Sequence, residues 1–263
     1  MRLERFPEFG EPPRYVETLR AAGFQLAAAL LFIALVAVGN LVLVSTDAAE
    51  TTHEALRGGW RGVLTLALGP PRIGVQIGHD GVAAHPDELG HLRGNTGGYA
   101  DGLSELVVNK SVARALKEGL EAQGVAVDLL RATPPAGYHA DLMLSLHADS
   151  VYDPARQGYK SSHFNPPRST LEPRLKRLID AAYLGATSLP DDTPNTTDAM
   201  RHYYAFNFRS YEHAAHPATP ALIVELGYLS NPADAALLRR PKQVAAALSG
   251  GVLTFLRERN RLP

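Results

Sequence analysis

The sequence contains no cysteine and carries almost no net charge. Without cysteine, the 263-residue chain can form neither disulfides nor thiolate metal sites, so any metal ion must be bound by His, Asp or Glu. The formal net charge of -1 argues against nucleic acid as a partner, because such binding calls for a basic surface. Hydrophobic residues (45%) and charged residues (20%) occur at ordinary frequencies, which indicates a globular protein.

Charged residues are also missing from one long stretch near the N-terminus. Residues 21–44 contain no Asp, Glu, Lys or Arg, and about 20 apolar residues suffice for a helix to cross a bilayer. The sequence therefore predicts an uncleaved, single-pass transmembrane helix. A cleaved secretory signal, with Ala48-Ala49 as the cleavage site, and a buried core helix are the alternatives.

The charges that flank this stretch predict its orientation. Four arginines precede it and acidic residues follow it, and the more basic side of a membrane span usually faces the cytoplasm. We therefore expect residues 1–20 to be a cytoplasmic tail and residues 45–71 to be a linker outside the cytoplasm. Residues 72–263 would then form an extracytoplasmic domain of a cell-membrane protein.

Apolar runs and helical periodicity alternate along this domain. Short apolar runs predict strands at residues 73–78, 126–130, 141–146 and 221–225. Apolar positions at helical spacing predict helices over 104–123 and 171–184, and a C-terminal helix with Val244, Leu248, Val252 and Phe255 on one face. Asn231 is expected to cap a helix that starts at Pro232. The alternation of strands and helices indicates an α/β sheet with right-handed crossovers.

Four polar residues lie where these elements begin or end. His79, His147 and Glu225 each follow an apolar run, and Glu105 opens the first long helix. In an open α/β sheet, ligands bind in the crevice beyond the carboxyl ends of the strands. Two histidines and one carboxylate can hold a catalytic zinc ion with a position left for water, and a second carboxylate can act as a base. The four residues therefore predict a zinc hydrolase.

The motifs around these residues resemble one known family. They are Gly78-His79-Asp80-Gly81, Glu105, Ser145-Leu146-His147-Ala148-Asp149 and Val224-Glu225-Leu226-Gly227-Tyr228-Leu229-Ser230-Asn231-Pro232. In this order they resemble the zinc-dependent N-acetylmuramoyl-L-alanine amidases, often called amidase 3, over roughly residues 72–258.

The resemblance implies a fold, a site and a substrate. The fold would be α/β, with a mixed, mainly parallel sheet flanked by helices. His79, Glu105 and His147 would bind Zn²⁺, and Glu225 would be the catalytic carboxylate, with a pKa raised by burial. The substrate would be peptidoglycan, cut at the amide between N-acetylmuramic acid and L-alanine. The histidines would also need acceptors for their second ring nitrogens, for which Asp80, Asp101 and Asp149 are the candidates.

Three features depart from the family pattern. The family has Asn where this chain has Asp149, and it has a helix before the His147 strand that residues 132–140 are too short to form. Residues 152–211 show no feature that aligns; they include an aromatic stretch at 202–208 that fits a strand or the wall of a groove. A segment within 151–215 that gates the site is a further hypothesis. The remaining histidines are expected to be surface or loop residues.

Two rival functions follow from these departures. One is a degenerate amidase that binds cell wall or a division partner without cutting it. The other is a zinc peptidase or amide hydrolase with a different substrate. The sequence indicates no particular activator protein, so the predicted partners are peptidoglycan and, through the N-terminal helix, the membrane.

Overall fold

Parallel strands built from the predicted apolar runs form the centre of the structure. The computed structural model describes residues 69–262, so the predicted tail, the predicted membrane span and nearly all of the linker lie outside the described residues. None of the helices between residues 69 and 262 combines the length and apolar character that a bilayer span requires.

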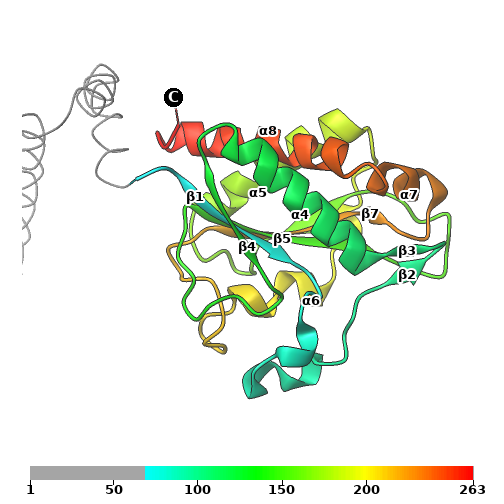
Figure 1. Ribbon diagram of the computed structural model, residues 1–263, viewed down its shortest axis with the longest axis horizontal. Coiled ribbons are helices and arrows are strands. Elements are labelled where there is room, and N and C mark those ends of the chain that lie inside the picture. Colours follow the sequence, from blue (N-terminus) through cyan, green and yellow to red (C-terminus); the bar gives the residue numbers. More distant parts are fainter. Residues whose placement is uncertain (1–68, 263) are drawn as a thin grey trace, which may run out of the picture. The chain divides into compact units, whose positions relative to one another are not determined.

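The main sheet has the strand order β4-β1-β5-β7-β6 (Figure 1). Its strands are β1 (Arg72–Ile77), β4 (Ala126–Leu130), β5 (Leu142–Asp149), β6 (Lys160–Ser162) and β7 (Ala221–Tyr228). The first four in the sheet order are parallel, and only β6 pairs antiparallel, with β7. A small hairpin of β2 (Tyr99–Ala100) and β3 (Leu103–Ser104) stands apart from it. The sheet is therefore mixed and mainly parallel, as the resemblance implies.

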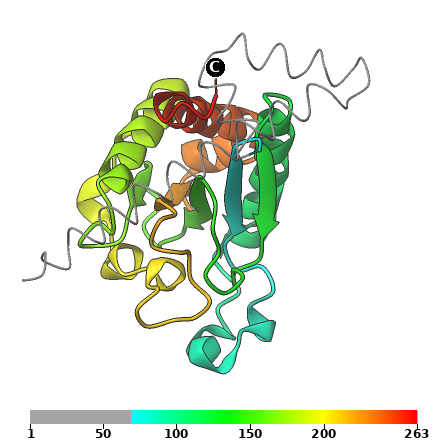
Figure 2. The same cartoon turned by 90° about the vertical axis from the view of Figure 1, so that its left-hand side faces the viewer.

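Three long helices cover one face of this sheet (Figure 2). They are α4 (Glu105–Glu121), α5 (Leu171–Thr187) and α8 (Pro241–Glu258). Successive side chains of a strand point to opposite faces, and it is Ile73, Val75 and Ile77 of β1 that pack in the helix-side core. The short helix α7 (Pro232–Leu238) follows β7, and Asn231 caps it by accepting hydrogen bonds from the backbone of Ala233 and Asp234. The predicted cap is therefore confirmed.

The opposite face is covered by irregular chain and short helices. A smaller core there joins Met143 and Ile223 of the sheet to Phe206. The short elements of the domain are α6 (Asp198–Arg201) and 3-10 helices at Val82–Ala84, Asp87–Leu92, Thr193–Asn195 and Tyr204–Phe206. Residues 132–140 form no helix, as expected, and Tyr138 of this segment packs directly against β1 at Gly74.

The structure differs from the sequence-based predictions mainly in length. Strands β5 and β7 continue three residues beyond the predicted ends, because their backbone pairing runs on from His147–Glu225 to Asp149–Tyr228 after the apolar pattern has stopped. The aromatic stretch at 202–208 is not a strand; Tyr203 and Phe206 are buried there around a 3-10 turn. Helix α5 packs in the main core against the sheet. It is therefore a fixed part of the fold and not the segment that would gate the site.

A buried ion pair fixes the irregular face to α5. Arg168 lies 2.6 Å from Glu172, and the two side chains are 4% and 0% exposed. The same guanidinium donates hydrogen bonds to the carbonyls of Phe206, Ala215 and Thr219. One arginine therefore holds both ends of the loop that follows the aromatic stretch.

We predict that Arg168→Met lowers the free energy of unfolding by about 3 kcal/mol or more, because it leaves Glu172 as an unpaired buried charge. Denaturant unfolding of both proteins measures the change. Arg174→Met is the matched control, since Arg174 pairs with Glu258 at the surface and its loss should leave the midpoint nearly unchanged. Equal midpoints for Arg168→Met and the wild type would contradict this role.

Candidate active site

His79 follows β1 in a conformation that few side chains adopt. Its φ angle is 67°, in the left-handed region, which is unfavourable for a residue other than glycine. The ring is fixed from behind, because Nδ1 lies 2.8 Å from the carbonyl oxygen of Asn95 and can donate a hydrogen bond to it. This arrangement leaves Nε2 directed at Glu105, at 3.0 Å from Oε1.

Glu105 is the first residue of α4, where the helix dipole favours a negative charge. Its Oε2 accepts a hydrogen bond from the backbone of Gly98 at 2.8 Å, which fixes the carboxylate and turns Oε1 towards the two histidines. Burial alone would raise the pKa of Glu105, but hydrogen bonds and charge from His147 and His79 outweigh burial and lower it. The carboxylate therefore stays ionised.

His147 lies near the carboxyl end of β5, on the face away from the long helices. Its Nδ1 is 3.0 Å from Oε1 of Glu105, and its Nε2 is 2.9 Å from the hydroxyl of Tyr203. Close packing fixes the ring from the other side: a Cβ atom at Gly78 would lie 2.5 Å from Cε1 of His147. Only glycine at position 78 leaves room for this ring.

Three predicted residues therefore converge on one point. His79, Glu105 and His147 each offer a ligand atom, and these atoms all lie within 4.8 Å of one another. Two imidazole nitrogens and a carboxylate oxygen are a typical ligand set for catalytic zinc, and each group is also fixed by a contact through its second polar atom. The residues present thus fit a zinc ion.

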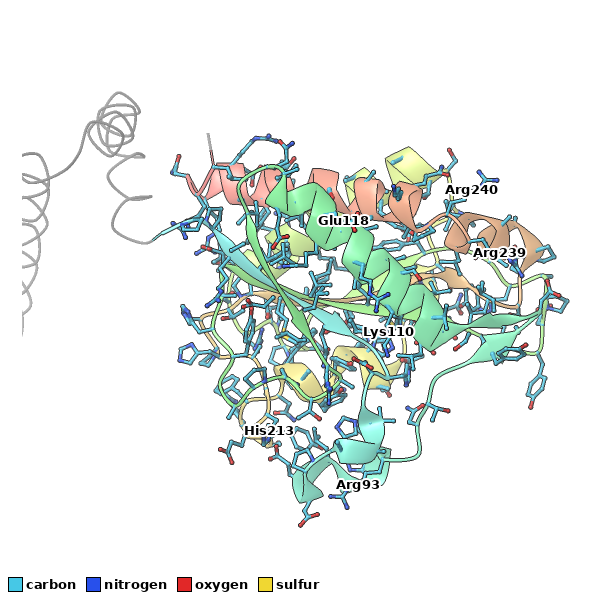
Figure 3. The ribbon with its side chains drawn as sticks, in the orientation of Figure 1. Arg93, Lys110, Glu118, His213, Arg239 and Arg240 are labelled. Carbon is cyan, nitrogen blue, oxygen red and sulfur yellow. The ribbon has the colours of Figure 1, made fainter. Side chains whose placement is uncertain are left out.

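The predicted acceptors for the histidines are wrong. Asp80 pairs with Lys110, labelled on α4 in Figure 3, at 2.7 Å. Asp101 lies 3.6 Å from Arg239, and Asp149 pairs with Lys160 instead. A backbone carbonyl and a tyrosine hydroxyl contact the histidines in their place. No local sequence signal marks either group, since Asn95 and Tyr203 are 16 and 56 residues away from their partners.

Glu225 lies beside this cluster, directly opposite His147 in the pairing of β5 with β7. It is partly exposed, yet its Oε2 is buried and has no hydrogen-bond partner among the described residues. Burial, the charge of Glu105 and the charge of Asp149 raise the pKa of Glu225 well above its usual range, and Lys160 opposes this shift. A raised pKa suits a carboxyl group that must both accept and donate a proton.

Two neighbouring cavities reach the cluster. One, of about 250 Å³, is lined by all four predicted residues and by Asp149. The other, of about 260 Å³, shares His79 and His147 with it and is otherwise lined by neutral and aromatic side chains. Three of these are histidines that the sequence did not select: His85, His91 and His202. Tyr203 and Tyr204 of the aromatic stretch also line this cavity, while Tyr203 belongs to the smaller core and Tyr204 packs against it.

The remaining histidines mostly lie where they were expected. His91, His139, His202 and His216 are exposed, and His53 lies outside the described residues. His85 also lies in a loop, but it is buried there, and its Nδ1 lies 2.6 Å from the hydroxyl of Thr133. His213, labelled in Figure 3, contacts Glu88 at 2.7 Å and so connects the Asp87–Leu92 turn with the loop after the aromatic stretch.

Fold and site together define a class: α/β proteins with a histidine–carboxylate cluster that could hold a metal ion at the carboxyl edge of a mainly parallel sheet. The sequence pattern of the N-acetylmuramoyl-L-alanine amidases matches residues 73–254. The chain belongs to this family of enzymes.

Solved structures with the same fold are also amidases. The N-acetylmuramoyl-L-alanine amidase of Clostridium difficile 630 is 18% identical with a TM-score of 0.52, over 72% of this chain and 97% of that one. The enzyme from Mycobacterium smegmatis is likewise 18% identical, with a TM-score of 0.54 over the same shares. The CwlD amidase of Clostridioides difficile, in complex with the GerS lipoprotein, is 16% identical with a TM-score of 0.51, over 72% and 99%. The comparison with curated proteins gives no match.

The close approach at Gly78 gives a test of the cluster. We predict that Gly78→Ala lowers zinc affinity by about tenfold or more, because the new methyl group must displace the ring of His147. Competition with a chromogenic chelator measures the affinity. Gly94→Ala is the matched control, since nothing lies within 4 Å of a Cβ atom there. Equal affinities of Gly78→Ala and the wild type would show that His147 is not a ligand.

Proposed function

We propose that the protein is a zinc-dependent amidase that hydrolyses the amide between N-acetylmuramic acid and L-alanine in peptidoglycan. The observation that carries this proposal is the position of Glu105 Oε1, 3.0 Å from a nitrogen of His79 and from a nitrogen of His147, beside Glu225. Family membership supports the substrate, and the names of the structurally similar enzymes agree with it.

The residues of the chain divide the chemistry between them. His79, Glu105 and His147 would hold the metal ion, which when bound supplies an acidic water molecule and a positive charge for the carbonyl oxygen. Glu225 would accept a proton from the water molecule that attacks the amide carbon. When the carbon–nitrogen bond breaks, Glu225 returns the proton to the nitrogen, so the products are a lactyl carboxylate and a free L-alanine amine.

Glu225→Gln tests this division of roles. The variant keeps the shape of the side chain but cannot accept a proton, so we expect kcat on purified muropeptides to fall by about 10²- to 10⁴-fold with one zinc ion still bound. Metal analysis and mass spectrometry of the products measure the two properties. His147→Ala is the companion variant, and it should lose zinc and activity together.

Other outcomes separate the rival functions. A wild-type protein that binds zinc but releases no L-alanine amine from any wall fragment would be a binding protein instead of an amidase. Cleavage at another amide bond would indicate a zinc peptidase. A wild-type protein that binds no zinc would contradict the ligand assignment itself.

We further propose that residues 72–263 form the catalytic domain of a single-pass cell-membrane protein and act outside the cytoplasm. The proposal rests on the uncharged stretch at 21–44 and on the arginines that precede it. In this arrangement residues 1–20 remain in the cytoplasm and residues 45–71 connect the helix to the enzyme. Peptidoglycan, the proposed substrate, lies outside the cytoplasm, which agrees with this location of the enzyme.

Fractionation of cells that express the full chain tests the anchor. We expect the protein in the membrane fraction at its full mass of 28.3 kDa, resistant to extraction by alkaline carbonate and released by detergent. A soluble protein that starts shortly after Ala49 would show instead that residues 21–44 belong to a cleaved signal.

A further inference from the structure

Lys160 is a buried ammonium group next to the proposed catalytic carboxylate. It lies on the edge strand β6, directly opposite Glu225 in the antiparallel pairing with β7, and it is only 2% exposed. Lysine is rarely buried in this way unless its charge is paired. Neither the metal cluster nor the proposed proton transfer uses it.

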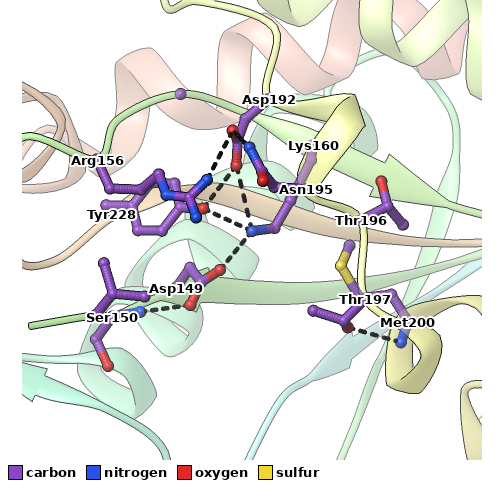
Figure 4. A network of polar contacts seen from close by, with 12 residues as sticks. Asp149, Ser150, Arg156, Lys160, Asp192, Asn195, Thr196, Thr197, Met200 and Tyr228 are labelled. Carbon is purple, nitrogen blue, oxygen red and sulfur yellow. Dashed lines mark hydrogen bonds and ion pairs between the residues drawn. The ribbon is translucent and has the colours of Figure 1, made fainter. Parts of the chain in front are cut away.

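The ammonium lies between two carboxylates (Figure 4). Its Nζ is 2.5 Å from Oδ2 of Asp149 and 3.4 Å from Oδ2 of Asp192. It also donates a hydrogen bond to the hydroxyl of Tyr228 at 2.7 Å, and that hydroxyl donates to Asp192 at 2.6 Å. All of the ammonium's polar contacts therefore lie within one small network.

Asp149 and Asp192 differ in their position relative to the active-site cavity. Asp149 lines the same cavity as His147 and Glu225, whereas Asp192 is buried behind Lys160, outside that cavity. Asp192 is held separately by Asn195, whose amide donates to it at 2.5 Å. Asp149 is also the residue at which this chain departs from the asparagine of the family pattern. The additional negative charge of Asp149 therefore lies in the active-site cavity, next to the Lys160 ammonium that offsets it.

The charged groups around Glu225 fit this arrangement. Asp149 lines the same cavity as Glu225, and Lys160 lies directly opposite Glu225 in the pairing of β6 with β7. Asp192 does not line that cavity. Without Lys160, Asp149 would be an uncompensated negative charge beside the proposed base.

We propose that Lys160 is a positioning residue for the amidase reaction: it holds Asp149 in place and cancels its charge at the Glu225 end of the site. Lys160 and Asp149 act as one neutral unit where the family pattern has a neutral asparagine. This inference rests on the proposed amidase activity.

Four variants of the full-length, zinc-loaded protein test this role on a purified muropeptide. Lys160→Met should lower kcat by about tenfold or more, and Asp149→Asn by about threefold or more, with KM within about twofold of the wild type in both. The double variant K160M/D149N removes both charges and should return kcat to within about threefold of the wild type. Asp192→Asn is the matched control: it removes the other carboxylate on the same ammonium and should leave kcat unchanged even if the melting temperature falls.

Turnover is measured well below the lowest melting temperature, with one zinc ion per chain in every variant. A merely structural role predicts that all variants lose stability while the folded enzymes turn over like the wild type. That result, or a double variant no faster than Lys160→Met, would overturn the proposal. If Lys160→Met does not fold, Asp149→Asn against Asp192→Asn decides it, since equal kcat values for these two would exclude a special role for the cavity-facing charge. A wild-type protein that binds zinc but cuts nothing refutes the proposed function itself, and this inference with it.

Discussion

The carboxylate of Glu105 joins the parts of the structure on which the site depends. It accepts hydrogen bonds from the backbone of Gly98 and of Ala148, and its Oε1 lies between nitrogens of His79 and His147. The Glu105 carboxylate therefore connects three segments: the end of β1, the start of α4 and the end of β5. The positive φ of His79 and the absence of a side chain at Gly78 are both consequences of bringing these segments so close together.

The same geometry shifts the pKa values of two nearby carboxylates, Glu105 and Glu225, in opposite directions. Burial would raise the pKa of Glu105, but hydrogen bonds and charge from His147 and His79 outweigh burial and lower it. Among residues 69–262 no donor contacts the buried Oε2 of Glu225, and burial with the charges of Glu105 and Asp149 raises its pKa. Environments that separate the pKa values of neighbouring acids commonly separate their roles, which agrees with the roles proposed here: Glu105 as an ionised metal ligand and Glu225 as the group that exchanges protons. The positive charge of Lys160 limits how far the pKa of Glu225 rises.

Much of this arrangement could be predicted from the sequence, because its determinants are local. Apolar runs located the four parallel strands, and the ends of three of these runs and the start of α4 located the four polar groups that meet. The contacts that orient them could not be predicted. Asn95, Tyr203 and Lys160 reach the site from a loop, a 3-10 turn and a short edge strand, and none of these has a periodic pattern. Strands β5 and β7 also outlast their apolar runs, since backbone pairing does not depend on side-chain polarity.

X-ray absorption spectroscopy of the purified, zinc-loaded protein tests the central claim most directly, because it reports the atoms that surround the metal. We predict one zinc ion per chain with two histidine nitrogens and carboxylate or water oxygens at about 2.0–2.2 Å, and one histidine fewer in a His79→Ala variant that still retains metal. A zinc site without histidine scattering, or one that His79→Ala leaves unchanged, would contradict the convergence of His79, Glu105 and His147 on a catalytic metal.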